Sequence, residues 1–214
     1  MKTWTRGLLT LWICTFTASY CFAGAYEDMF QAMEKGDGAI IVDLLNRGMD
    51  VNSVDRDGNT LLMLAARSGQ GEILEILLRN NANILRVNKY RDSALMLAVL
   101  RGHQSIVAVL VDAGAELNPE GWTPLIYAAY EGRTNIAKFL VDHGADVDAQ
   151  SPSGMTALIA AARNGHLETV ESLLEDEPDL DVADQQGKTA LDWANATENS
   201  SIVAILRRAA GIEP

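Results

Sequence analysis

The sequence predicts an all-α protein, a solenoid of six helix–turn–helix units joined by short β-turn fingers. Three observations lead to this fold class. The chain repeats itself about every 33 residues, apolar residues recur at helical spacing within each repeat, and glycines recur where helices should end. Five of the six repeats align on one anchor residue each, with intervals of 33, 30, 33 and 33 residues: Thr60, Ser93, Thr123, Thr156 and Thr189.

Each anchor residue is expected to begin the first helix of its repeat. Threonine and serine are good N-caps, and Pro124 follows Thr123 at the first helical position, where proline is tolerated. Counted from the anchor, leucine recurs at position +2 and alanine at +5, so both lie on one helical face. The glycines at +9 are expected to end this helix in a left-handed turn: Gly69, Gly102, Gly132 and Gly165.

The second helix of the repeat is mostly apolar at +13, +14, +16, +17 and +18, a wide stripe suited to burial between neighbours. Gly48, Gly114 and Gly144 are expected to end it at +21. Turns such as Asp55–Gly58 and Asp184–Gly187 then form the finger that leads to the next repeat. The first repeat is degenerate and is found by stepping back 33 residues from the first anchor.

The chain resembles the ankyrin repeat family from about residue 26 to residue 211, so the expected fold is an ankyrin-repeat solenoid. The motifs that carry this resemblance are Gly58–Ala66 (GNTLLMLAA), Gly121–Ala129 (GWTPLIYAA) and Val141–Val147 (VDHGADV). The resemblance implies an elongated, slightly curved stack that binds a partner on its concave face and has no intrinsic catalysis. Some exported bacterial members of the family are associated with catalases, which suggests a setting for this chain.

Three departures from the repeat pattern predict local irregularity. The finger near Asn118–Gly121 is three residues short. Arg91 stands where the turn glycine belongs, so we expect its finger to be irregular. Glu177 replaces the glycine at +21 and precedes Pro178, so we expect the loop there to be rebuilt.

The first 25 residues are expected to be a signal peptide. Lys2 and Arg6 precede an apolar stretch of eleven residues, 8–18, which is too short to span a bilayer, and small residues allow cleavage after Ala23 or Ala25. An uncleaved anchor and a lipoprotein site at Cys21 are the alternatives. Both cysteines, Cys14 and Cys21, lie within this segment, as suits a chain exported to an oxidising compartment. We therefore expect a periplasmic protein.

The mature chain is expected to divide into an N-terminal capping repeat (26–54), four central repeats (55–182) and a C-terminal capping repeat with its tail (183–214). The net charge of −12 argues against binding of nucleic acid or of an anionic membrane surface, because both need a basic face. The partner is therefore expected to be another protein, and the chain itself a monomer.

Partner contacts are expected at the finger tips and at the exposed end of the first helix, which stacking does not use. Aromatic residues and arginines dominate binding hot spots, and they recur at these positions. Three arginines there form a ladder suited to an acidic partner. In an alternative interpretation, Trp122 and Tyr130 only fill the gap beside the short finger. The candidate contact residues are Arg56, Arg67, Tyr90, Leu100, Arg101, Trp122, Tyr130, Met155 and Arg163.

Neither an enzyme, a metal site nor a cofactor is expected. His103 and His166 occupy a structural position of the repeat, +10, and His143 lies in a turn. The acidic run 175–181 lacks the turn glycine of a calcium loop, so we interpret it as solvated. The expected function is a non-catalytic scaffold or adaptor in the cell envelope that supports an oxidative-stress enzyme such as a catalase. An inhibitor or immunity-type protein that neutralises a toxic enzyme is the alternative.

Overall fold

The computed structural model describes Gly24 and residues 26–212, and their regular secondary structure is helical apart from two single β-bridges. The predicted signal peptide, residues 1–25, lies outside the described residues except for Gly24. Within the described part, no helix combines the length and the apolar character needed to cross a membrane.

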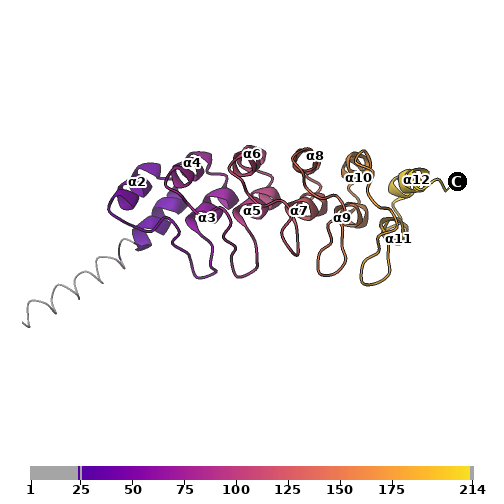
Figure 1. Cartoon of the computed structure of the whole chain (residues 1–214), viewed down its shortest axis with the longest axis horizontal. Coiled ribbons are helices and arrows are strands. Elements are labelled where there is room, and N and C mark those ends of the chain that lie inside the picture. Colours follow the sequence, from indigo (N-terminus) through magenta and orange to yellow (C-terminus); the bar gives the residue numbers. More distant parts are fainter. Residues whose placement is uncertain (1–23, 25, 213–214) are drawn as a thin grey trace, which may run out of the picture.

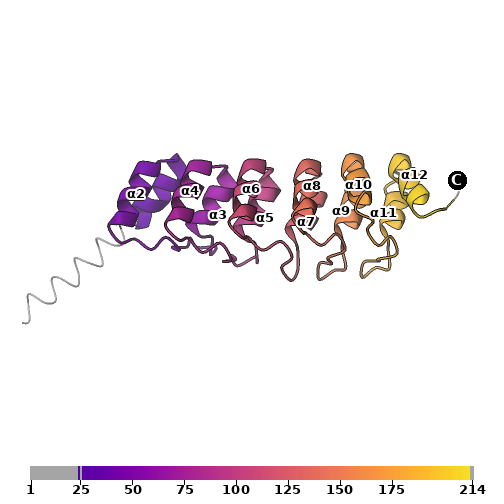
Figure 2. The same ribbon diagram turned by 45° about the horizontal axis from the view of Figure 1, so that its top comes forward.

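Six helical hairpins stand side by side in one row (Figure 1), and the turned view keeps this order (Figure 2). The inner helices are residues 26–35, α3 (Leu61–Ser68), α5 (Ala94–Arg101), α7 (Pro124–Tyr130), α9 (Ala157–Asn164) and α11 (Ala190–Ala196). The outer helices are α2 (Gly38–Asn46), α4 (Gly71–Arg79), α6 (Gln104–Asp112), α8 (Thr134–Asp142), α10 (Leu167–Leu174) and α12 (Ser200–Ala209). The prediction of an all-α solenoid of six hairpins is confirmed.

The helix boundaries follow from the anchor residues and glycines. Every anchor side chain accepts a hydrogen bond from the backbone N–H at +3, as Thr60 does from Met63 at 3.2 Å. Three inner helices end at a glycine with φ between +75° and +76°: Gly69, Gly102 and Gly165.

Burial is concentrated between neighbouring hairpins. The leucines at +2 are at most 2% exposed in four repeats: Leu62, Leu95, Leu125 and Leu158. The alanines at +5 are 0% exposed in all five anchored repeats, and their small size lets the inner helices approach one another closely. Leu191, the equivalent leucine of the last repeat, is only half-buried, because no hairpin covers it.

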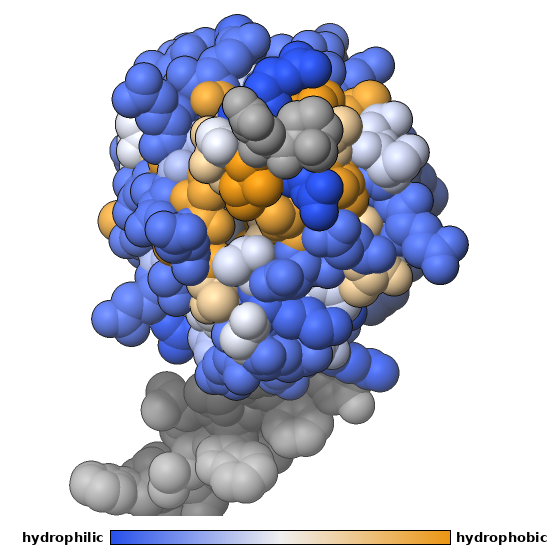
Figure 3. Space-filling model, turned by 90° about the vertical axis from the view of Figure 1, so that its right-hand side faces the viewer, coloured by the Kyte–Doolittle hydropathy of each residue, from blue (hydrophilic) through white to orange (hydrophobic). Residues whose placement is uncertain are grey.

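The C-terminal end of the stack keeps some apolar surface. Val203, Ala204 and Ile212 line a depression of about 660 Å³ there, and Figure 3 shows this apolar patch with hydrophilic residues around it. Asn195 occupies position +6, where four earlier repeats bury an alanine or valine. Arg207 occupies position +18, which is apolar in the four earlier repeats. Both polar residues make this end a poor surface for another hairpin.

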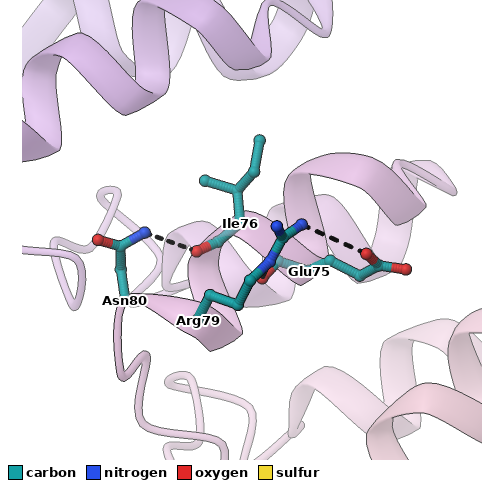
Figure 4. Close-up of polar contacts among 4 residues, drawn as sticks. All are labelled: Glu75, Ile76, Arg79 and Asn80. Atoms are coloured by element: carbon teal, nitrogen blue, oxygen red, sulfur yellow. Dashed lines mark hydrogen bonds and ion pairs between the residues drawn. The ribbon is translucent and has the colours of Figure 1, made fainter.

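The outward faces of the outer helices are solvated. On α4 the Arg79 guanidinium lies 3.4 Å from the Glu75 carboxylate, and the Asn80 amide donates to the Ile76 carbonyl at 2.8 Å (Figure 4). The two charged side chains are 71% and 59% exposed, so the pair contributes little to stability.

Four fingers share one hydrogen-bonding pattern. In each, the N–H at −5 donates to the carbonyl at −1, and the N–H at −2 donates to the carbonyl at −5. The connection between α6 and α7, residues 113–123 and called the short loop below, makes neither bond and projects least in Figure 1. This confirms the predicted short finger. The regular ones are finger 1 (54–59), finger 2 (87–92), finger 3 (150–155) and finger 4 (183–188).

The expectation that Arg91 makes finger 2 irregular is wrong. Arg91 adopts φ +67°, the left-handed conformation that glycine takes in the other fingers, and its N–H still donates to the Asn88 carbonyl. The Asn88 side chain also accepts the N–H groups of Tyr90 and Asp92, both at 2.9 Å. These bonds offset the roughly 1–2 kcal/mol that a left-handed backbone costs an L-residue.

Glycine serves a second purpose in finger 3. A Cβ on Gly154 would lie 2.9 Å from Cα of Asp184 in finger 4, whereas a Cβ on Gly187 in the last finger would meet nothing within 4 Å. Finger 2 precedes the short loop, so no full finger crowds Arg91. An arginine at position 91 of finger 2 is therefore compatible with the loss of three residues in the loop that follows.

The loop at Glu177 is also regular, contrary to expectation. Glu177 takes φ +51° and its N–H donates to the Leu174 carbonyl at 3.4 Å, as the residues at +21 do in other repeats. Pro178 has no N–H, so the loop lacks the next bond, which Ala82 makes to Leu77 in the second repeat. The loop keeps its course and loses one hydrogen bond.

Replacing Gly154 and Gly187 separately by alanine tests the packing of the fingers. Both variants should lose about 1–2 kcal/mol of unfolding free energy from the left-handed backbone. Gly154→Ala should lose a further 1–3 kcal/mol, roughly, because its methyl group meets the backbone of finger 4. Urea unfolding followed by circular dichroism measures both, and equal losses would contradict close packing between fingers 3 and 4.

Candidate partner-binding face

The inner face, formed by the inner helices and the fingers, holds the residues predicted to contact a partner. Leu100 and Trp122 are half-buried there, and Met155 is buried. The remaining six are exposed, and they spread from the second repeat to the fifth: Arg56, Arg67, Tyr90, Arg101, Tyr130 and Arg163.

Met155 does not belong to the free surface, so its assignment as a contact residue is wrong. It is 6% exposed and packs in the hydrophobic core. Its N–H donates to the Ser151 hydroxyl at 3.1 Å and its carbonyl accepts from the Ser151 N–H, which closes finger 3. Position −1 is buried in finger 1 as well, where Asn59 is 3% exposed.

Aromatic side chains gather at the centre of the inner face. The Trp122 ring centroid lies 5.1 Å from that of Tyr127 and 5.8 Å from that of Tyr130, the latter in an edge-to-face arrangement. Trp122 and Tyr127 also pack against the core, as the gap-filling interpretation expects. Tyr130 is 41% exposed and Tyr90 71% exposed, so the gap-filling interpretation does not account for these two rings.

Sequence reasoning missed Tyr127, because position +4 is apolar in neighbouring repeats, as at Leu97 and Ala160, and reads as core. The Tyr127 hydroxyl donates to Oδ1 of Asp92 at 2.9 Å, which joins α7 to finger 2. Burial, together with the neighbouring Asp92 carboxylate, raises the pKa of Tyr127 far above its ordinary value. The hydroxyl therefore remains a donor across the physiological pH range.

Trp193, also at +4, was missed for the same reason. The Arg163 guanidinium lies 4.4 Å from its ring centroid and the Lys188 ammonium 4.2 Å, and its indole N–H donates to Oδ2 of Asp184 at 2.8 Å. Arg163 is therefore held on an aromatic ring, unlike Arg101. The predicted arginine ladder consists of side chains in different environments.

Asp55 in finger 1 and Asp184 in finger 4 accept internal hydrogen bonds. Burial alone would raise the pKa of Asp184, but bonds from the Lys188 N–H, the Trp193 indole and the Gln186 N–H lower it below its ordinary value. Asp55 is similar: bonds from Asn59 and the neighbouring N–H groups outweigh burial and lower its pKa. The nearby Arg67 guanidinium also contributes to the lowered pKa of Asp55, so this arginine and this carboxylate interact.

A groove of about 560 Å³ lies at the N-terminal end of the inner face. Tyr26 and Phe30 come from residues 26–35, Arg56 from finger 1, and Leu64 and Arg67 from α3. The groove thus combines apolar side chains with these two arginines and with the carboxylates of Glu27, Glu34 and Asp55.

The histidines stabilise the stack. His103 and His166 begin α6 and α10, and Nε2 of each contacts a carbonyl of the preceding repeat, that of Tyr130 at 2.9 Å in the case of His166. Within Gly24 and residues 26–212, no group of three or more histidine, cysteine, aspartate or glutamate residues is arranged to hold a metal ion.

A row of helical hairpins with an exposed inner face defines a repeat solenoid. The family model described as "Ankyrin repeats (3 copies)" matches residues 29–120, 87–151 and 147–214, so the chain belongs to the ankyrin repeat family. Ankyrin repeats bind other proteins, and the chain is a protein–protein interaction module. No curated protein matches the chain as a relative.

Replacing Asp184 by alanine tests the electrostatics of finger 4. Two backbone N–H groups and the Trp193 indole lose their acceptor, so the unfolding free energy should fall at pH 7. Because folding lowers the pKa of Asp184, the wild-type advantage should be complete above about pH 4 and decline as the pH falls through the lowered pKa.

Urea unfolding at pH 7 and pH 3 measures this difference, with Asp181→Ala as the control, because the Asp181 carboxylate accepts no hydrogen bond from the described residues. A wild-type advantage that persists unchanged at pH 3 would contradict the assignment.

Proposed function

We propose that this chain is a non-catalytic scaffold or adaptor that is exported to the bacterial periplasm and, as a monomer, holds a protein partner on its inner face. The enzyme that it supports is proposed to act in oxidative stress, as catalases do. An inhibitor of a toxic enzyme would use the same face and is distinguished by the identity of the partner.

One observation carries the binding proposal, the aromatic cluster of Trp122, Tyr127 and Tyr130. Its rings are fixed by mutual packing and by the bond to Asp92, so a partner meets a preorganised apolar surface. Tyrosine and tryptophan lose little conformational entropy on binding and dominate hot spots. Tyr90, 71% exposed on the adjacent finger 2, extends this surface.

Charge supports a partner with acidic groups around its contact site. Arg56, Arg67 and Arg101 are exposed on the inner face, whereas Asp55, Asp92 and Asp184 already accept internal hydrogen bonds. These carboxylates keep their negative charge, so the basic character rests on the three exposed arginines themselves, within a chain whose net charge is −12.

Two features of the sequence support export. Basic residues precede a short apolar stretch and then small residues within positions 1–25, and residues 26–214 contain no cysteine. The catalase setting rests on the resemblance to exported bacterial ankyrin proteins alone.

Affinity capture from a periplasmic extract of the source bacterium, followed by mass spectrometry, tests the binding proposal. Wild-type protein should recover one dominant partner. The double variant Trp122→Ala, Tyr130→Ala should recover at least about tenfold less of this partner, because truncating a hot-spot side chain costs about 2 kcal/mol or more. Arg67→Glu with Arg101→Glu should also weaken capture.

The matched control reverses two charges on outer helices, Arg79→Glu with Lys138→Glu, and should leave recovery unchanged. Equal recovery by all variants would contradict binding on the inner face. Catalase activity in the wild-type eluate would support the oxidative-stress role, and a toxic enzyme in its place would support the inhibitor role.

A further inference from the structure

Neighbouring fingers are joined by a backbone hydrogen bond at one register. The Lys89 N–H of finger 2 donates to the Asp57 carbonyl of finger 1 at 3.1 Å, and the Gln185 N–H of finger 4 donates to the Ser153 carbonyl of finger 3 at 2.9 Å. In both pairs position −4 is the donor and position −3 of the preceding finger is the acceptor. The fingers therefore form two paired groups, which the short loop separates.

A slot remains between the two groups. Its volume is about 270 Å³, and finger 2, the short loop, α5, α7 and finger 3 contribute to its walls. Most of its lining is aromatic or otherwise apolar. The charged members are Arg91 and Asp92 on finger 2 and Glu120 on the short loop. The apolar and aromatic lining residues are Tyr90, Met96, Trp122, Tyr127 and Pro152.

The two edges of the slot differ in the backbone hydrogen-bonding groups that they present to a bound chain. Tyr90 occupies the acceptor position −3, and its carbonyl accepts no hydrogen bond from any described residue. Pro152 occupies the donor position −4 of finger 3, and proline has no N–H. One edge is thus an open acceptor and the other is purely apolar.

Trp122 supplies the complementary donor. Its indole N–H bonds to no described residue and is not among the buried unpaired groups, unlike the indole of Trp193, which is bonded to Asp184. The residues that line the slot therefore include one free acceptor and one free donor beside apolar side chains. Extended peptides add to exposed backbone edges through such bonds, while side-chain pockets select the sequence.

We infer that this slot binds one extended segment of the protein partner, which takes the place of the missing finger. The segment donates a backbone N–H to the Tyr90 carbonyl, accepts the Trp122 indole N–H on a carbonyl, and packs one uncharged apolar side chain against Trp122 and Pro152. The charged lining residues, Arg91, Asp92 and Glu120, lie on finger 2 and the short loop, whereas Trp122 and Pro152 offer apolar surface, which favours an apolar residue against them. This inference rests on the proposed protein-binding function and names the element of the partner that is recognised.

A variant with a restored finger tests the inference. Inserting Arg-Val-Asn, the sequence of residues 86–88, between Asn118 and Pro119 brings the short loop to the length of its neighbours and fills the slot. The probe is a phage-displayed library of linear twelve-residue peptides, selected on the wild-type protein. Peptides that wild type enriches should bind the restored-finger variant at least about tenfold more weakly.

Unchanged circular dichroism and thermal midpoint establish that the variant is folded. N-methylation of the selected peptide, one amide at a time, should weaken binding about tenfold at one position, the amide that faces Tyr90. Retained binding by every N-methylated peptide would overturn the inference.

The other outcomes separate the slot from the protein-binding function. Peptides that bind both proteins equally would overturn the slot as their site while supporting peptide binding elsewhere on the chain. Failure to enrich any peptide would overturn the slot and leave the periplasmic capture to decide the proposed function. A wild-type dimer that the restored-finger variant does not form would identify the occupant as a second copy of this chain and would overturn the assignment to a foreign segment.

Discussion

A single helical hairpin of this chain cannot bury its own apolar face, so the structure depends on the hairpin that packs against it. The leucines at +2 are enclosed in four repeats and only half-buried in the last, which no described hairpin covers on that side. The alanines at +5 allow the inner helices to come close, and the side chains at +10 reach back to carbonyls of the preceding repeat. Because each contact joins nearest neighbours, a change in one loop leaves the rest of the row in register.

The same dependence on neighbours explains the candidate site. Finger 3 needs glycine at −2, since a side chain there would meet the backbone of finger 4, whereas finger 1 leaves ordinary contact distance at Gly58. Deletion of three residues before Trp122 removes that constraint on finger 2 and opens a place where aromatic rings meet solvent. The site is thus a consequence of an interrupted repeat, in which Tyr127 ties α7 to finger 2 and Trp122 lies between Tyr127 and Tyr130.

The repeat period, the N-caps, the helix-ending glycines and the short loop follow from the sequence, because each depends on residues close together in the chain. Two expectations failed at Arg91 and Glu177, where local hydrogen bonds hold an L-residue in a left-handed backbone. Met155 was placed on the surface because the repeat period does not indicate whether a finger side chain points toward the core or toward solvent. Tyr127 and Trp193 both lie at position +4, which is apolar in the other repeats, so the sequence pattern places them in the core. Their partners, Asp92 and Arg163, belong to the preceding repeat and lie 35 and 30 residues away in sequence.

Backbone amide hydrogen exchange at single-residue resolution tests most directly whether the fingers form two paired groups around an open slot. The Lys89 and Gln185 amides are bonded to the preceding finger. They should exchange markedly more slowly than the Arg56 amide, which holds the same position in finger 1 and donates to no described residue. Exchange of all three amides at the same fast rate would contradict the pairing of fingers and, with it, the account of the slot.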